Sequence, residues 1–199
     1  VDDLLTAHPD IAYIKWDANR HVEQVGSTYL PDDRQTHFWV DYTRGLYSIY
    51  QRIREKYPDV MLQACASGGG RVDYGSLQYH DEFWTSDNTD ALQRIYMQYA
   101  TNLIYPPLAT ASHVSASPGH QTGIITPLKF RFDVAMSGRL GMELQPKNMS
   151  ETEKAFAREA IVNYKTHIRE LVTRGDLYRL ISPYACTNNH AANMLVSKD

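Results

Sequence analysis

The segment of residues 13–20 combines apolar residues with four polar side chains whose spacing could support catalysis: Lys15, Asp17, Asn19 and Arg20. In an extended strand successive side chains point to opposite faces, so Lys15 and Asp17 share one face and Trp16 lies on the other. A neighbouring ammonium group favours the ionised carboxylate, which is what a nucleophile or an electrostatic stabiliser needs. The same spacing is also typical of a surface ion pair where a strand meets a loop.

A second carboxylate, Asp87, stands three residues after Trp84 at the end of another apolar segment. With Asp17 kept ionised beside Lys15 and Asp87 kept protonated beside apolar groups, the pair would have the division of labour of glycoside hydrolysis. Retaining enzymes hold their two carboxyl groups roughly 5 to 5.5 Å apart, and inverting enzymes roughly 6.5 to 9.5 Å apart. Three other carboxylates compete for these roles, although each could instead be exposed or cap a helix: Asp73, Asp81 and Asp90.

The glycine run from Gly68 to Gly70 follows Cys65 directly after a predicted strand. A phosphate-binding loop would need a G-K-S/T or a G-x-G-x-x-G pattern, and the run has neither. Glycines let the backbone approach a ligand closely or adopt positive φ. The run therefore predicts either a contact with a sugar hydroxyl or a tight turn, and Cys65 is interpreted as a buried thiol because no histidine partner is identifiable.

Composition and charge favour a neutral small substrate. The chain is 43 % hydrophobic and 11 % aromatic, which is enough for a core, and its net charge of -3 comes without a basic block. We therefore expect no nucleic-acid partner. We also expect no membrane partner, because no apolar run approaches the roughly 18 residues of a span. Aromatic residues suit sugar rings, and they suit an ordinary core equally well.

The cysteines and histidines do not indicate a metal or another cofactor. Cys65 and Cys186 lack a C-x-x-C spacing, and we expect free thiols, with a single bridge as the alternative. The histidines at positions 80, 113, 120 and 167 match no zinc motif. His113 could bind a ligand, donate to a substrate or be a core histidine.

Short apolar segments alternate with helical patterns, which favours a parallel α/β arrangement. The predicted strands are residues 11–16, 60–65, 82–86, 108–114 and 140–144. A crossover helix is predicted from an apolar face that consists of Phe38, Tyr42, Leu46, Ile49 and Ile53. A second helix is predicted over residues 87–104, with Leu92, Ile95 and Tyr99 on one side.

Two further helices and two extended pieces complete the pattern. A short helix is predicted over residues 126–138, and a long one begins at the capping box formed by Ser150 and Glu153 and ends before Gly175. Its predicted buried stripe is Phe156, Ala160, Tyr164, Ile168 and Leu171. Residues 177–181 and 191–196 then read as extended. Five strands are too few for an eight-stranded barrel of about 250 residues, so the sheet is either open or part of a barrel.

The three loops that follow the first three predicted strands resemble those of the α-galactosidases of glycoside hydrolase family 36. Residues 15–20 are similar to that family's K-W-D-x-N-R segment, residues 65–73 to its C-x-S-G-G-G-R-x-D loop and residues 84–90 to its W-x-S-D-N-T-D segment. Residues 112–116, 120–122 and 178–183 also resemble family segments. The resemblance covers nearly the whole chain in the family's order, although Asn193 stands where the family more often has tryptophan.

This resemblance implies an α/β fold that is part of a (β/α)8 TIM barrel, about its last five βα units. The barrel part would comprise residues 1–175, without the first strands or the flanking β-sandwich domains, and residues 176–199 would lead towards a C-terminal β domain. We accordingly expect the chain to be a piece of a longer parent. No targeting segment is visible, and the cytoplasm is the favoured location.

The resemblance also implies a double displacement with retention at a terminal α-galactoside, as in melibiose or raffinose. Asp17 would be the nucleophile and Asp87 the acid/base. The galactose subsite would be lined by Lys15, Asn19, Cys65, Gly68 and Trp84. Strict alternation places Trp84 and Asp87 on opposite faces, so the strand should end or bulge near Thr85 if both contact the sugar.

Several functions stay open at this level. The chemistry would be similar in a galactosyltransferase of the raffinose-synthase type or in an α-N-acetylgalactosaminidase, and an isolated piece of the barrel could be catalytically silent. The expected partner is an α-galactoside oligosaccharide, and we expect the full-length parent to form a homo-oligomer. No cofactor is required by this chemistry.

Overall fold

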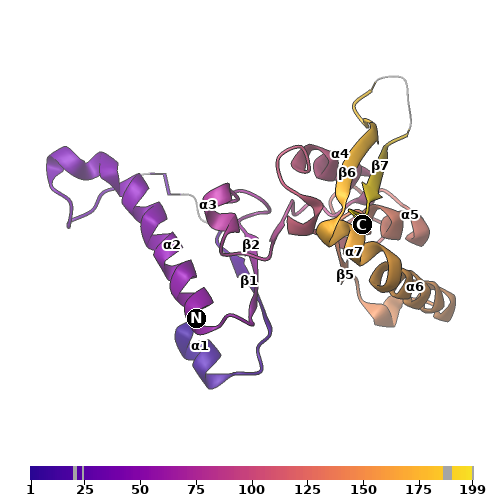
Figure 1. Ribbon diagram of the computed structural model, residues 1–199, viewed down its shortest axis with the longest axis horizontal. Helices are drawn as coiled ribbons and strands as arrows, with labels where there is room; N and C mark the ends of the chain where they lie inside the picture. Colours follow the sequence, from indigo (N-terminus) through magenta and orange to yellow (C-terminus); the bar gives the residue numbers. More distant parts are fainter. Residues whose placement is uncertain (20–21, 24, 186–189, 199) are drawn as a thin grey trace. The chain divides into compact units, whose positions relative to one another are not determined.

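The computed structural model describes residues 1–19, 22–23, 25–185 and 190–198. The chain divides into two compact units, Val1–Phe83 and Trp84–Asp199 (Figure 1). Arg20 and Cys186, both named above, lie outside the described residues. Within the part of the chain that the structure describes, no helix is long and apolar enough to cross a membrane.

The first unit is built around parallel strands that agree with the predicted ones to within two residues at their starts. These are β1 (Tyr13–Asp17), β2 (Met61–Cys65) and β3 (Glu82–Trp84), of which the first two residues belong to this unit. β1 pairs with β2 in parallel, with Asp17 opposite Cys65, and β2 pairs with β3 in parallel. The helical elements of this unit are α1 (Asp2–Ala7), the 3₁₀ helix η1 (Asp32–His37), α2 (Phe38–Lys56) and α3 (Tyr74–Leu77). Of these, only α2 was predicted.

The crossover helix α2 forms as predicted, but its buried face is displaced from the predicted one. Tyr50 and Ile53 are buried on α2, whereas Ile49 and Tyr42 are exposed. Ile53 packs with Leu5 of α1 and Leu62 of β2 in one hydrophobic cluster. The prediction for Ile49 and Tyr42 was wrong because apolar spacing alone does not show which residues of a broad apolar arc meet a neighbour.

Polar side chains are buried on the sheet face that also bears Lys15 and Asp17. The Tyr13 hydroxyl donates to Oε1 of Glu82 at 2.9 Å, and Nε2 of Gln63 donates to the same oxygen at 2.7 Å. Gln63 and Glu82 are both buried. Gln63 and Glu82 each lie two residues before the end of their strand, and because side chains alternate they share a face with its last residue. Their hydrogen bonds link β1, β2 and β3 just below the ends of the strands.

The second unit contains a parallel strand pair with its helices, followed by an antiparallel pair. Its elements are α4 (Ala91–Thr101), η2 (Pro107–Ala109), β4 (Thr110–Ser115), α5 (Leu128–Ala135), β5 (Arg139–Glu143), η3 (Pro146–Asn148), α6 (Glu151–Asn163), a π-helical turn (Tyr164–Ile168), α7 (Arg169–Arg174), β6 (Asp176–Ile181) and β7 (Ala192–Val196). β4 pairs in parallel with β5, and β6 pairs antiparallel with β7. The fourth strand starts later than predicted because the prolines place residues 107–109 in a 3₁₀ helix.

Helix α4 differs from the prediction in both its start and its buried face. It begins at Ala91 because Asp90 is its N-cap, so residues 87–90 stay in the preceding loop. Its buried side chains include Arg94 and Gln98, whereas Leu92 is exposed. Ile95 and Tyr99 are half-buried, so the predicted side is only partly covered. The fully buried side is polar because the facing elements offer hydroxyl and carbonyl groups, which satisfy a polar helix face.

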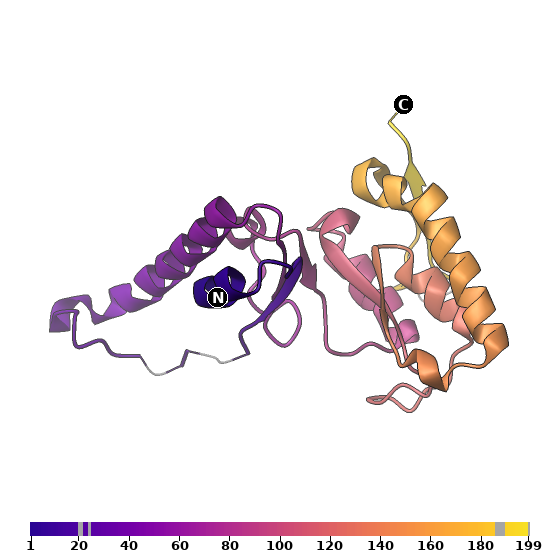
Figure 2. The ribbon, with the colours of Figure 1, turned by 90° about the horizontal axis from the view of Figure 1, so that it is seen from below.

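The long C-terminal helix of this unit is confirmed together with its capping box. The Ser150 hydroxyl accepts from the Glu153 N–H, and the Glu153 carboxylate accepts from the Ser150 N–H. Its predicted stripe is buried or half-buried. Figure 2 shows α6 as a long helix, and the π-helical turn and α7 continue from it without a break in the chain. At that turn the Tyr164 hydroxyl donates to the Gly138 carbonyl and accepts from the Leu140 N–H, so it anchors the start of β5.

Candidate active site

Asp17 is the last residue of β1, and the predicted alternation along this strand is confirmed. Tyr13, Lys15 and Asp17 are exposed, whereas Ile14 and Trp16 are half-buried on the opposite face. Lys15 and Asp17 therefore lie on one face at the carboxyl end of the strand. Carboxyl ends of parallel strands are where active sites of α/β proteins are built.

Cys65 lies opposite Asp17 in the β1–β2 register and is a buried free thiol. Burial raises the pKa of this thiol, and the negative charge of Asp17 together with a hydrogen bond to it acts in the same direction. The backbone of Gly68 and the charge of Lys15 act in the opposite direction. The thiol is thus held protonated against the carboxylate, which does not suit a nucleophile.

The glycine loop is a tight turn fixed to the end of β1. Ser67 and Gly68 have φ of 51° and 87°, in the left-handed region. Oδ1 of Asn19 accepts a 2.7 Å hydrogen bond from the Ser67 N–H, and the Ala18 N–H donates to the Cys65 carbonyl at 2.9 Å. Asn19 therefore uses its amide oxygen to shape the loop beside Asp17.

Asp87 and Trp84 are brought together in the second unit. β3 ends at Trp84, so the strict alternation that would separate the two side chains does not apply, as the sequence required. The indole Nε1–H of Trp84 donates to Oδ1 of Asp87 at 3.1 Å. Trp84 is 3 % exposed, whereas the Asp87 carboxylate is exposed at the end of the strand.

The Trp84 ring is held by two further side chains. The imidazole of His113 on β4 lies 4.5 Å from it between centroids, tilted by 46°, and the guanidinium of Arg94 lies 4.5 Å from its centroid. Nδ1 of His113 is 3.7 Å from a carboxylate oxygen of Glu143. Gly141, opposite His113 in the β4–β5 register, leaves room for the imidazole, because a Cβ there would collide with it.

The three competing carboxylates all have structural partners. Asp73 caps α3 and accepts from the hydroxyl of Tyr47, and burial together with this hydrogen bond raises the pKa of Tyr47 to about 12. Asp81 pairs with Arg54 and accepts from the Leu62 N–H. Asp90 caps α4 and accepts from the hydroxyl of Thr122 at 2.9 Å. Asp17 and Asp87 remain as the exposed carboxylates at strand ends.

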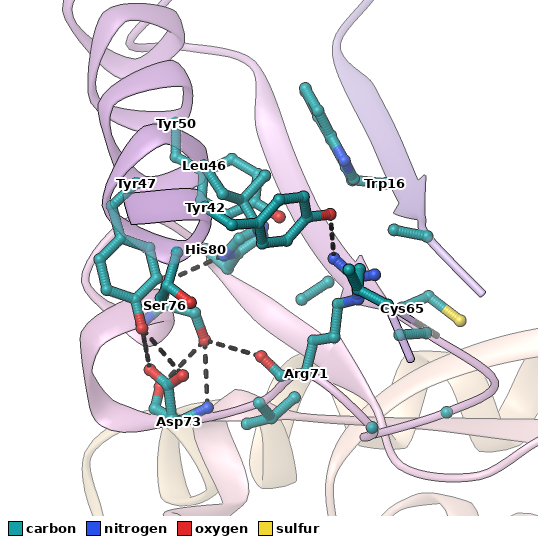
Figure 3. A pocket seen from close by; sticks show the side chains of 18 of the residues that line it. Trp16, Tyr42, Leu46, Tyr47, Tyr50, Cys65, Arg71, Asp73, Ser76 and His80 are labelled. Atoms are coloured by element: carbon teal, nitrogen blue, oxygen red, sulfur yellow. Dashed lines mark hydrogen bonds between the residues drawn. The ribbon is translucent and has the colours of Figure 1, made fainter. Parts of the chain in front are cut away.

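A cavity of about 270 Å³ in the first unit lies between α2 and the segment 64–73 (Figure 3). Its walls include aromatic side chains, and Trp16 packs against Tyr50 with the ring centroids 5.2 Å apart. Figure 3 shows Arg71 reaching to Tyr42, whose hydroxyl accepts from it at 2.9 Å. The cavity includes Cys65 and Gly68 in its lining but lies on the Trp16 side of β1. Among the described residues, no group of three or more histidine, cysteine or acidic side chains could hold a metal ion.

Parallel βα units with exposed carboxylates at the strand ends are typical of barrel-type glycoside hydrolases. The sequence profile of the Melibiase family matches residues 1–175, and the chain belongs to this family.

Relatives agree with this assignment over the whole chain. The chain is 44 % identical over 199 residues to α-galactosidase AgaA of Geobacillus stearothermophilus, covering 100 % of this chain and 27 % of that protein. It is 43 % identical to α-galactosidase 1 of Pediococcus pentosaceus, covering 98 % of this chain and 26 % of that protein. The chain thus spans about a quarter of the length of these curated relatives.

Solved structures confirm the predicted fold class. The crystal structure of the family 36 α-galactosidase AgaA matches with a TM-score of 0.93 at 44 % identity, covering 98 % of this chain and 27 % of that one. The α-galactosidase from Lactobacillus brevis matches with a TM-score of 0.95 at 38 % identity, covering 99 % of this chain and 26 % of that one. The five parallel strands with their helices are part of a (β/α)8 barrel.

Sequence reasoning missed residues that hold the site without belonging to a recognised motif. Arg94 lies on α4 four residues after Asp90, and residues at this spacing share one face of a helix. This polar pair was the signal in the sequence that could have pointed to Arg94. Gly141 carried no signal, because its role depends on the register between β4 and β5.

Proposed function

We propose that the full-length protein containing this chain is a retaining α-galactosidase that removes terminal α-galactosyl groups from oligosaccharides. The observation that carries the proposal is the difference among the candidate carboxylates in their exposure and in their structural partners. Asp17 and Asp87 are exposed at the ends of β1 and β3, whereas the other candidates cap helices or pair with an arginine. Structures of AgaA in complex with raffinose and with stachyose support the substrate class.

In the proposed reaction a carboxylate oxygen of Asp17 attacks the anomeric carbon while the glycosidic C–O bond breaks. Asp87 gives its proton to the departing oxygen, which leaves a galactosyl ester on Asp17 and a carboxylate on Asp87. That carboxylate then takes a proton from water as the water oxygen attacks the anomeric carbon and releases Asp17. Two displacements restore the original anomeric configuration.

The relative's complexes support these two assignments. Its raffinose complex carries an aspartate-to-asparagine substitution, and its stachyose complex carries an aspartate-to-alanine substitution. The separation between the two substituted aspartates in that sequence equals the separation between Asp17 and Asp87 in this one.

We further propose that the galactosyl group is bound around these carboxylates by Lys15, Asn19, Cys65, Gly68 and Trp84. Lys15 lies on the same face of β1 as Asp17, and Cys65 lies beside Asp17 in the strand register. The thiol, which burial keeps protonated, can donate to a carboxylate or to a hydroxyl. Trp84 positions Asp87 through its indole N–H.

We propose the domain division predicted above, with the barrel part in residues 1–175 and the start of a β domain in residues 176–199. The family match ends at residue 175. The antiparallel pair of β6 and β7 begins at Asp176. Both observations support a change of architecture at this position.

The test uses the full-length gene product with raffinose and with an aryl α-galactoside whose phenol is a good leaving group. We expect Asp17→Asn to abolish turnover of both. We expect Asp87→Asn to reduce kcat/KM for raffinose far more than kcat/KM for the aryl galactoside, because kcat/KM reports the first displacement, in which a good leaving group needs little protonation. Asp73→Asn is the matched control, because Asp73 caps a helix. Near wild-type turnover by Asp17→Asn would contradict the nucleophile assignment.

A further inference from the structure

We propose that Arg94 is a positioning residue that holds the loop and the indole ring on either side of Asp87. The inference rests on the proposed function, because it assigns Asp87 the acid/base role. Arg94 itself lies on α4 and is 3 % exposed, so it acts from behind the strand end rather than on a sugar.

The guanidinium group clamps the loop on both sides of Asp87. Its Nε–H donates to the Asn88 carbonyl at 2.7 Å, and an Nη2–H donates to the Ser86 carbonyl at 2.6 Å. These carbonyls belong to the residues immediately before and after Asp87. Two bonds from one rigid, planar group fix the position and the orientation of the backbone that carries the carboxylate.

The same guanidinium lies over the ring of Trp84, with its central carbon 4.5 Å from the ring centroid. Trp84 in turn donates its indole N–H to Asp87. Arg94 therefore acts on the Asp87 carboxylate by two routes, through the backbone and through the ring. A lysine has neither the planar fork nor the flat face, so it cannot replace both.

Helix α4 gives Arg94 a rigid base. Gln98, one turn further along, accepts from the hydroxyl of Ser112 on β4 at 3.0 Å and donates to the hydroxyl of Ser137 at 2.8 Å. After another turn, Asn102 donates to the hydroxyl of Thr110 at 3.1 Å. We call Arg94, Gln98 and Asn102 the polar ladder of α4. Of these residues, Gln98 and Asn102 fix α4 to β4.

Arg94 is a buried charge that does not form a close ion pair with any described residue. Burial lowers its pKa to about 10, and the charges of Glu143 and Asp87 oppose that shift, so the group stays protonated at neutral pH. Its Nη1 has no hydrogen-bond partner among the described residues. Burial of a charge is costly without full pairing, and such positions cluster at functional sites.

The test compares Arg94→Lys and Arg94→Gln with the wild type in the full-length gene product, using raffinose and an activated aryl α-galactoside. A displaced acid should lower kcat/KM for raffinose by about 10²-fold in both variants and change that for the activated substrate only a few-fold. Arg54→Lys is the control, because Arg54 also donates to two backbone carbonyls, those of Tyr79 and Val60. Equal losses on both substrates, or wild-type values for Arg94→Lys, would overturn the inference.

A crystal structure of the Arg94→Gln variant provides a readout that does not depend on turnover. We expect residues 86–88 and the Trp84 ring to move, and an unchanged loop would overturn the inference. If the loop moves but wild-type protein does not cleave α-galactosides, the positioning role stands and the proposed function is wrong.

Discussion

The indole N–H of Trp84 donates a hydrogen bond of 3.1 Å to the carboxylate of Asp87, three residues further along the chain. The bond exists because β3 ends at Trp84 and Asp87 lies in the loop that follows. One residue that packs in the interior thus orients one carboxylate at the surface. This bond and the contacts around it lead to expectations that can be measured.

The hydrogen bond itself can be removed by Trp84→Phe. The substitution keeps an aromatic ring for Arg94 and His113 but deletes the donor, so we expect turnover of raffinose to fall about tenfold, as for one hydrogen bond to a charged group. Steady-state kinetics on the full-length gene product measures this. Trp39→Phe is the control, because Trp39 is 46 % exposed on α2. Unaltered kinetics in Trp84→Phe would show that the bond does not contribute.

Gly141 is expected to be intolerant of a side chain. In Gly141→Ala the added Cβ would collide with the His113 imidazole, and turning that ring aside would break its contact with Trp84. We expect a loss of about 1 to 3 kcal/mol in the free energy of unfolding, as for overpacking, and reduced turnover. The matched control is Gly45→Ala in α2, where nothing lies within 4 Å. That variant should gain about 0.5 to 1 kcal/mol. Thermal unfolding midpoints that rank the two variants in the opposite order would contradict this interpretation.

The reactivity of Cys65 reports on the charge of Asp17. Burial raises the pKa of the thiol, and the Asp17 carboxylate acts in the same direction. In Asp17→Asn the negative charge is absent, so we expect alkylation of Cys65 at mildly alkaline pH to be about threefold faster. Mass spectrometry of the peptides measures the modification at Cys65, with Cys186 as an internal reference. Equal rates at Cys65 in both proteins would argue against a contact between thiol and carboxylate.

Stability is expected to fall at mildly acidic pH because of His80. Burial lowers the pKa of this histidine below its ordinary value of 6.5, and the nearby charge of Arg54 adds to the effect. The folded state therefore binds fewer protons than the unfolded state, so stability is retained above pH 6.5 and is lost as the pH falls below it.

The free energy of unfolding can change by about 1.4 kcal/mol per pH unit for one group. Thermal unfolding at a series of pH values measures it, and His80→Gln should flatten the curve between about pH 7 and pH 5. Nδ1 of His80 donates to the Ser76 carbonyl at 2.9 Å, a bond that glutamine can also make. A curve of equal slope in the variant would assign the pH dependence to other groups.

The strands and the loops that carry Asp17 and Asp87 were predictable because their signals are local. A short apolar run that ends in Asp17, or in Trp84 and then Asp87, specifies both a strand and the polar loop after it. The capping box at Ser150 was equally local, and it forms as predicted. Recognition of the three loop motifs then supplied the family, which the profile match confirmed.

The features that could not be predicted depend on contacts between segments far apart in the sequence. The buried face of α4 is polar because hydroxyl groups of β4 satisfy it, and nothing in the residues of α4 shows this. Similarly, the competing carboxylates could be set aside only when their partners were visible, such as Tyr47 for Asp73 and Arg54 for Asp81.

The polar ladder has a consequence for how this site can be exchanged between proteins. Arg94 holds the loop that carries Asp87, and Gln98 and Asn102 hold α4 on β4. The position of Asp87 therefore depends on the βα unit that follows it. A loop of residues 84–90 that is transplanted alone would lack Arg94 and helix α4, which fix its position. We therefore expect a portable block to include at least residues 84–115, and both natural recombination and engineering around Asp87 should cut outside that block.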